Sequence, residues 1–184
     1  MKALKKTINL TCWLIISFLL FQITESKAQV LEMSAQDLTE ASTAVFYGKC
    51  TGIECAWNEN KSVIYTYVTV APEEYLKGNL GPAAVIAVPG GKVGDIIYEV
   101  SDMPVFTEGE EIMAFVRTNK AGKNIVTGGY QGKMKIDTDK NTGKKVVFET
   151  TLAKNGTVKG NETKKLEKVK LEDFVAKVKG YSKN

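Results

Sequence analysis

Apolar and polar positions along the chain predict a run of short strands over residues 43–150, with one helix before it and one after it. The clearest strand is 63–70, which is rich in β-branched and aromatic residues. Glycine, asparagine and aspartate turns separate it from the other predicted strands, which lie at 44–50, 83–88, 96–100, 112–116, 124–127, 133–136 and 144–148. Many short strands joined by such turns predict a mainly β domain, either a closed barrel or a sandwich.

Helical patterns occupy the two flanks of this strand region. Residues 34–42 form a short predicted helix, in which Ser34 can cap the start and Asp37 places negative charge in the first turn. Near 170–179, apolar residues at Leu171, Phe174 and Val178 follow helical spacing, and Gly180 can end the helix. We therefore expect two short helices to accompany the sheet.

The first 28 residues have the pattern of an export signal. Three lysines near the start precede an apolar run at 10–21, and Ser26-Lys27-Ala28 supplies small residues for cleavage. The run is shorter than the roughly 20 residues that a membrane-spanning helix needs. The pattern predicts a signal peptide at 1–28, a mature domain at 29–184 that is secreted or periplasmic, and no membrane span after cleavage.

The charge distribution argues against nucleic acid as a partner. Acidic residues outnumber basic ones over 29–153, whereas lysines are in excess over 154–184. The chain contains a single arginine, Arg117, and arginine is the residue best suited to bidentate recognition of phosphates and bases. We interpret the lysine-rich end as a solvated face.

The residue types available for chemistry are few. Because the chain has no histidine, histidine triads and histidine metal sites are excluded, and we predict no catalytic residues, no metal site and no cofactor. The cysteines outside the signal are Cys50 and Cys55. In an oxidising compartment they favour a disulfide, but straight strand would hold them too far apart, so pairing depends on a turn or bulge at residues 51–54.

Two sets of acidic residues partly resemble known sites, one a calcium loop and the other a pair of catalytic carboxylates, but neither fulfils the pattern. Asp137, Asp139 and Asn141 begin like a calcium loop, but Thr142 stands where that loop needs glycine, so we interpret them as a polar hairpin tip. A second group, around the turn at 108–111, could supply paired carboxylates, but we interpret it as solvated; its members are Glu108, Glu110 and Glu111.

The most distinctive loop is 89–94, which contains three glycines. Its glycines permit positive φ and a sharp change of strand, which is one interpretation. The other is a loop whose bare backbone approaches a ligand. The sequence leaves both open, and we predict a binding site that includes Pro89, Gly90, Gly91, Gly94 and Gln131.

A series of short segments carries a family resemblance over residues 44–136. The segments are 45–49, 64–70, 75–78, 88–91, 106–110 and 131–133. In this order they resemble an uncharacterised family of exported bacterial β-barrel proteins, which is more remotely similar to the netrin-like and tissue-metalloprotease-inhibitor modules. The resemblance implies a single OB-like antiparallel barrel, with no established catalytic residues to transfer. Those inhibitors chelate zinc through an N-terminal cysteine, whereas the mature chain is expected to begin at Gln29.

These observations favour an exported, non-enzymatic binding module for an unknown protein or glycan ligand. The first alternative is an inhibitor or companion of an extracellular metalloprotease, which the resemblance implies. The second is a hydrolase that uses the carboxylates of Glu108, Glu110 or Glu111. A small barrel without catalytic groups favours the binding module, because OB-type barrels present a strand face and its loops to ligands.

Overall fold

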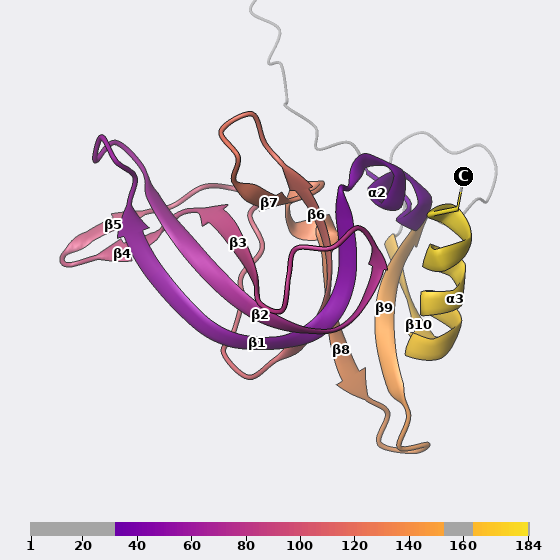
Figure 1. Cartoon of the computed structure of the whole chain (residues 1–184). Coiled ribbons are helices and arrows are strands. Elements are labelled where there is room, and N and C mark those ends of the chain that lie inside the picture. The colour runs from indigo at the N-terminus through magenta and orange to yellow at the C-terminus, as the bar shows by residue number, and fades with distance from the viewer. Residues whose placement is uncertain (1–31, 153–163, 184) are drawn as a thin grey trace, which may run out of the picture. The chain divides into compact units, whose positions relative to one another are not determined.

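The computed structural model describes residues 32–152 and 164–183 (Figure 1). The predicted signal peptide at 1–28 lies outside the described residues. The strands are β1 (Ala44–Trp57), β2 (Ile64–Lys77), β3 (Ala84–Pro89), β4 (Gly91–Val93), β5 (Ile96–Tyr98), β6 (Glu111–Thr118), β7 (Asn124–Val126), β8 (Lys133–Thr138), β9 (Lys145–Leu152) and β10 (Lys164–Lys170). The helices are α2 (Ala35–Ala41), the 3-10 helix η1 (Gly129–Gly132) and α3 (Leu171–Tyr181). The described part is thus mainly β, as the sequence predicts.

Eight of these strands form one antiparallel sheet, in the order β10-β9-β8-β6-β1-β2-β3, with β7 paired to β6 beside this path. The sheet is not closed, so the prediction of a closed barrel is wrong. Strands β3 and β7 lie near each other, but they are not paired through backbone hydrogen bonds that would close the sheet. Instead, the side-chain amide of Asn124 on β7 donates to the carbonyl of Val85 on β3 at 3.3 Å. At the other end β9 and β10 continue the sheet outward from β8 instead of turning back.

The sheet separates two buried clusters, because successive side chains of a strand point to opposite faces. In β1, Val45 enters one cluster and Phe46 the other; in β6, Phe115 and Ala114 divide in the same way. The first cluster lies beneath α2 and α3 and includes Leu38 and residues of both helices. The second lies inside the curl of β1, β2, β3, β6 and β7. The open sheet is therefore stabilised by apolar burial on both faces.

Strands β1 and β2 are long and strongly bent (Figure 1), and their pairing contains register shifts. At one shift Gly48 opposes Pro72, where a Cβ on Gly48 would lie 2.2 Å from the carbonyl oxygen of Ala71. Glycine is needed there because the two backbones approach too closely for any side chain. A second shift leaves Thr51 as an extra residue between Cys50 and Gly52, and such bulges bend and twist a strand.

The two helices cover the same face of the sheet (Figure 1). Helix α2 begins with a capping box, in which Ser34 and Asp37 bond each other's backbone N–H groups. The hydroxyl of Ser34 also donates to the Asp37 carboxylate at 2.6 Å, and this bond, followed by the one from the Ser34 backbone N–H, lowers the pKa of Asp37. Helix α3 follows β10 directly and buries Leu171, Phe174 and Val178, the apolar positions that the helical spacing predicts. None of the helices in the described ranges is long and apolar enough to span a bilayer.

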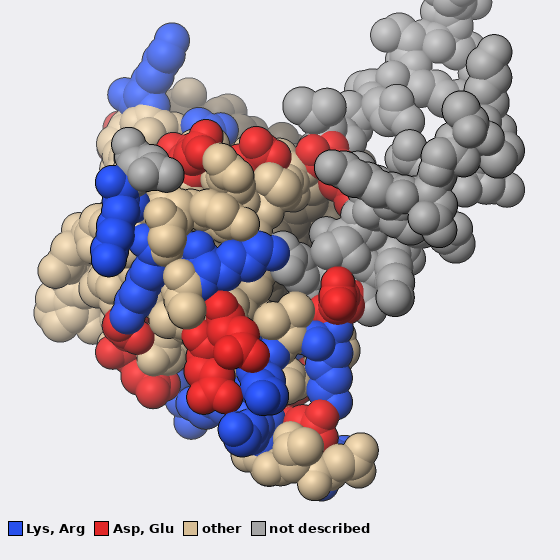
Figure 2. Space-filling view, turned by 90° about the vertical axis from the view of Figure 1, so that its right-hand side faces the viewer, with Lys and Arg blue, Asp and Glu red and all other residues tan. Residues whose placement is uncertain are grey.

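The lysine-rich end is paired with acidic residues of the sheet. Lys168 on β10 bonds Asp139 of the β8–β9 hairpin, and Lys179 on α3 bonds Glu74 of β2. Seen from the side of α3, basic and acidic residues lie next to one another on the described surface (Figure 2). The opposite charges of the two parts of the chain therefore help to dock its C-terminal elements onto the sheet.

Candidate functional site

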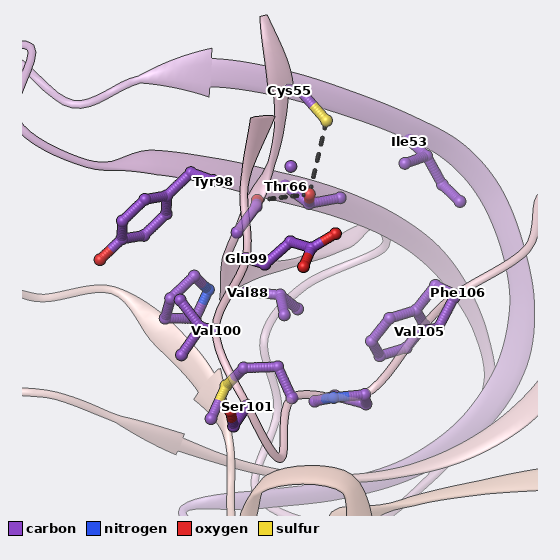
Figure 3. A pocket seen from close by; sticks show the side chains of 15 residues that line it. Ile53, Cys55, Thr66, Val88, Tyr98, Glu99, Val100, Ser101, Val105 and Phe106 are labelled. Atoms are coloured by element: carbon purple, nitrogen blue, oxygen red, sulfur yellow. Dashed lines mark hydrogen bonds between the residues drawn. The ribbon is translucent and has the colours of Figure 1, made fainter. Parts of the chain in front are cut away.

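A cleft of about 730 Å³ lies where β3 turns into β4. One side is formed by β1 and β2, and the other by the irregular segment 99–106 that follows β5 (Figure 3). We call it the hairpin cleft, after the β4–β5 hairpin at its edge. Its lining consists of Ile53, Cys55, Thr66, Val88, Pro89, Gly90, Gly91, Tyr98, Glu99, Val100, Ser101, Met103, Pro104, Val105 and Phe106.

The corner between β3 and β4 is fixed by its glycines. Gly90 has φ 113° and Gly91 has φ 136°, which side chains other than glycine rarely adopt. The N–H of Gly90 donates to the carbonyl of Ile64 at 2.9 Å, and the hydroxyl of Thr66 donates to the carbonyl of Gly90 at 2.7 Å. A Cβ on Gly91 would lie 2.7 Å from Oγ1 of Thr66. The glycines are thus required by the sharp change of strand, and they also line the cleft.

The β4–β5 hairpin gives the cleft an apolar rim. Its strand β5 exposes three consecutive apolar residues, of which Tyr98 lines the cleft. Across the opening, Val105 is 81% exposed. The rim consists of the exposed large apolar residues in the lining, which are Ile53, Tyr98 and Val105. An apolar cleft with an apolar rim is typical of an interaction surface.

A buried ion pair holds the C-terminal end of the cleft wall at 99–106, where the chain continues to Glu110. The ammonium of Lys133 lies 2.7 Å from the Glu110 carboxylate and donates to the carbonyl of Val105 at 2.8 Å, above the ring of Phe106. The two charged side chains are only 13% and 8% exposed. The same carboxylate accepts the N–H of Thr107 at 2.8 Å. These contacts tie the wall to β8.

The carboxylates at 108–111 therefore differ from one another. Glu110 is buried and paired, so the prediction that it is solvated is wrong; the reason is Lys133, which the fold brings to it from another strand. Glu111 pairs with Lys145 at 2.8 Å and raises its pKa, whereas Glu108 is exposed. None of these three lines the hairpin cleft.

Glu99 is the sole acidic or basic residue in the lining of the hairpin cleft. Figure 3 shows its side chain within the ring of lining residues, reaching into the space between Thr66 and Val88. Within the described ranges, no hydrogen bond or ion pair engages its carboxylate. The cleft thus presents one unpaired negative charge in apolar surroundings.

Both cysteines outside the predicted signal are free thiols, and β1 runs through both, so residues 51–54 do not fold back to join them. Cys50 is fully buried, and desolvation raises the pKa of its thiol. Cys55 lines the cleft with its Sγ 3.4 Å from Oγ1 of Thr66 (Figure 3). Because that hydroxyl already donates to Gly90, the thiol is the donor in this contact.

The predicted binding residues divide into two groups. Pro89, Gly90 and Gly91 line the hairpin cleft. Gly94 lies in the turn that joins β4 and β5, outside the lining. Gln131 lies in η1, where its side-chain oxygen accepts the N–H of Met33 at 2.9 Å, so it attaches the segment before α2 and does not belong to the cleft.

The sequence analysis missed the wall at 99–106 and the contribution of Ile53. A signal was present in Met103-Pro104-Val105-Phe106, an apolar run that belongs to no predicted strand. Apolar residues in a segment without regular structure need either burial or a partner. The sequence pattern of residues 96–100 predicts a strand that includes Tyr98 and Glu99, whereas in the structure β5 ends at Tyr98 and the chain continues along the cleft.

No group of three or more Cys, Asp or Glu side chains in the described ranges is arranged to hold a metal ion. At the predicted polar hairpin tip, Asp139 accepts the N–H groups of Asn141 and Thr142 and bonds Lys168, and the Lys168 bond chiefly lowers its pKa. Compared with known protein families and with curated proteins, the chain matches none. The argument for function therefore rests on the hairpin cleft, whose lining is suited to binding.

Proposed function

We propose that the protein is a non-enzymatic binding module that acts outside the cytoplasm and holds an extended, apolar segment of a partner protein in the hairpin cleft. The observation that carries this proposal is the gathering of exposed apolar side chains around one opening, including Ile53 and Val105. The volume of about 730 Å³ is within the usual range for ligand sites. The signal peptide predicted at 1–28 is the basis for the proposed location.

The chemistry of the lining favours a protein segment over a glycan. A sugar presents many hydroxyl groups, each of which needs a hydrogen-bond partner when it leaves water. The lining is mostly aliphatic or glycine backbone, and the Thr66 hydroxyl is already bonded to Gly90. Apolar side chains of a peptide, by contrast, gain free energy by leaving water in such a cleft.

We also propose that the curled half of the sheet is related to OB-type barrels. Supporting this, β1, β2 and β3 follow one another in the sheet, β6 returns to pair with β1, and the β7 residue Asn124 bonds β3. Inhibition of a metalloprotease and carboxylate-dependent hydrolysis stay predictions, and no feature of the described residues favours either.

Selection of peptides tests the binding proposal. A library of random twelve-residue peptides is panned on the purified protein, and the affinity of each selected peptide is measured by fluorescence anisotropy. Binding through the cleft predicts that Val105→Lys and Ile53→Lys weaken the selected peptides at least tenfold, because both residues are exposed and line the cleft. The matched control is Val85→Lys, because Val85 is also an exposed valine, at 45%, but lies on β3 outside the cleft lining. If no peptide is selected, or if all three variants bind like the wild type, the proposal fails.

A further inference from the structure

We infer that the segment bound in the hairpin cleft carries a lysine or arginine side chain between apolar residues, and that Glu99 receives this cation. The inference rests on the proposed function and specifies the chemistry of the partner. Its basis is the position of one carboxylate, without a partner in the described ranges, among apolar lining residues.

The lysine that supports the wall of the cleft at Val105 is not available to Glu99. Lys133 contacts both carboxylate oxygens of Glu110, at 2.7 and 2.9 Å, and donates to the carbonyl of Val105. It is therefore neutralised behind the wall. Among the lining residues themselves there is no lysine or arginine, so the charge of Glu99 faces the cleft.

Binding changes the surroundings of this carboxylate. In the free protein Glu99 is exposed and solvated by water. A segment that fills the cleft with aliphatic side chains removes that water, and a carboxylate that loses water without gaining a partner is strongly unfavourable. A cation in the segment restores a charge-assisted bond to the carboxylate. The cleft therefore discriminates against a purely apolar segment and favours one that carries a cation.

The neighbouring lining residues suit the rest of such a side chain. Lysine and arginine pack their aliphatic stems on apolar surface while the charged end stays at a polar group. Val88 lies beside Glu99 in the cleft, and Val105 and Phe106 lie on the side toward which the Glu99 side chain points (Figure 3). Apolar residues on either side of the cation would contact the rim at Ile53 and Val105, which explains why the rim is exposed in the free protein.

Parallel selections test this inference. The twelve-residue library is panned on the wild type, on Glu99→Gln and on Glu99→Lys, with Glu167→Gln as the control because Glu167 is an exposed carboxylate on β10. We expect lysine or arginine to recur among apolar residues in peptides selected by the wild type and by the control. Glu99→Gln should lose this recurrence, and Glu99→Lys should replace it with aspartate or glutamate.

Affinities of remade peptides give the quantitative test. Replacing the recurrent cation of a selected peptide by glutamine should weaken wild-type binding about tenfold, which corresponds to about 1.4 kcal/mol. The same replacement should have no effect on Glu99→Gln. If peptides bind through the cleft but the cation makes no difference, the inference is overturned and the proposed function stands. If no peptide binds through the cleft, both fail.

A second copy of the chain is the competing occupant of the cleft. Sedimentation velocity over a range of concentrations distinguishes it from a peptide. A dimer that Val105→Lys dissociates, and that competes with the selected peptides, would assign the cleft to self-association and overturn the inference.

Discussion

Replacing Lys133 by methionine should lower the free energy of unfolding more than a substitution at the surface does. Methionine keeps a long apolar side chain but removes the ammonium that lies between the Glu110 carboxylate, the carbonyl of Val105 and the ring of Phe106. The carboxylate of Glu110, only 8% exposed, is then left with the N–H of Thr107 as its remaining hydrogen-bond donor.

The size of the effect follows from burial. Removing one partner of a buried ion pair costs about 3–5 kcal/mol, because the other charge stays buried without compensation. Domains of this size have unfolding free energies of about 5–15 kcal/mol. The loss therefore corresponds to a fall in Tm of roughly 6–20 °C, at about 2–4 °C per kcal/mol.

Urea unfolding followed by far-UV circular dichroism measures this free energy in the wild type, in Lys133→Met, in Glu110→Gln and in the double variant. The double variant removes both charges, so it should regain much of the stability that Lys133→Met loses, and the double-mutant cycle should show a coupling of more than 1 kcal/mol. A cost below about 1 kcal/mol for Lys133→Met, or additive effects in the cycle, would refute the argument that a buried pair holds the wall.

Three further outcomes follow from other contacts. Gly48→Ala should lower the free energy of unfolding by about 1–3 kcal/mol or more, because the added Cβ would overlap backbone atoms. Gly52→Ala is the control and should be tolerated, because its Cβ would have no neighbour closer than 4.0 Å. Equal effects of the two substitutions in urea unfolding would contradict this prediction. Iodoacetamide followed by peptide mapping should label Cys55 in the native protein and Cys50 only after unfolding, because Cys50 is buried and its thiol pKa is raised; rapid native labelling of Cys50 would count against it. The bond from the Lys179 ammonium lowers the pKa of Glu74, so the stabilisation it provides is present above about pH 4.5 and is lost as the pH falls through the folded-state pKa. The Glu74→Gln variant should therefore lose less stability on acidification than the wild type, by up to about 1 kcal/mol. Identical pH profiles of unfolding free energy would exclude the contact.

Local patterns predicted the elements of this fold well. The apolar spacing of Leu171, Phe174 and Val178 led to α3, and the β-branched run at 63–70 led to β2. The alternation of apolar and polar residues does not predict which side chains are buried where both faces of a strand carry apolar residues. In β3 every residue from Ala84 to Val88 is apolar, yet Ala84, Ile86 and Val88 are buried whereas Val85 is exposed at the surface.

Closure and the site depend on contacts between distant segments, which sequence patterns do not contain. Whether β3 pairs with β7 depends on the register of the strands and the distance between them. In the structure a single side-chain hydrogen bond from Asn124 on β7 to Val85 on β3 takes the place of backbone pairing. The burial of Glu110 depends on Lys133, and the cleft depends on the path of the chain after Tyr98. The glycines of the β3–β4 corner were found because their φ values are a local requirement.

The contact between α2 and α3 has a consequence for the order of folding. Leu38 lies near one end of the described chain and Phe174 near the other, yet both belong to the same buried cluster. During synthesis α2 emerges long before α3, which packs in the same cluster. That face of the sheet must therefore stay unfinished, with apolar surface open to chaperones or to aggregation, until almost the whole polypeptide has emerged.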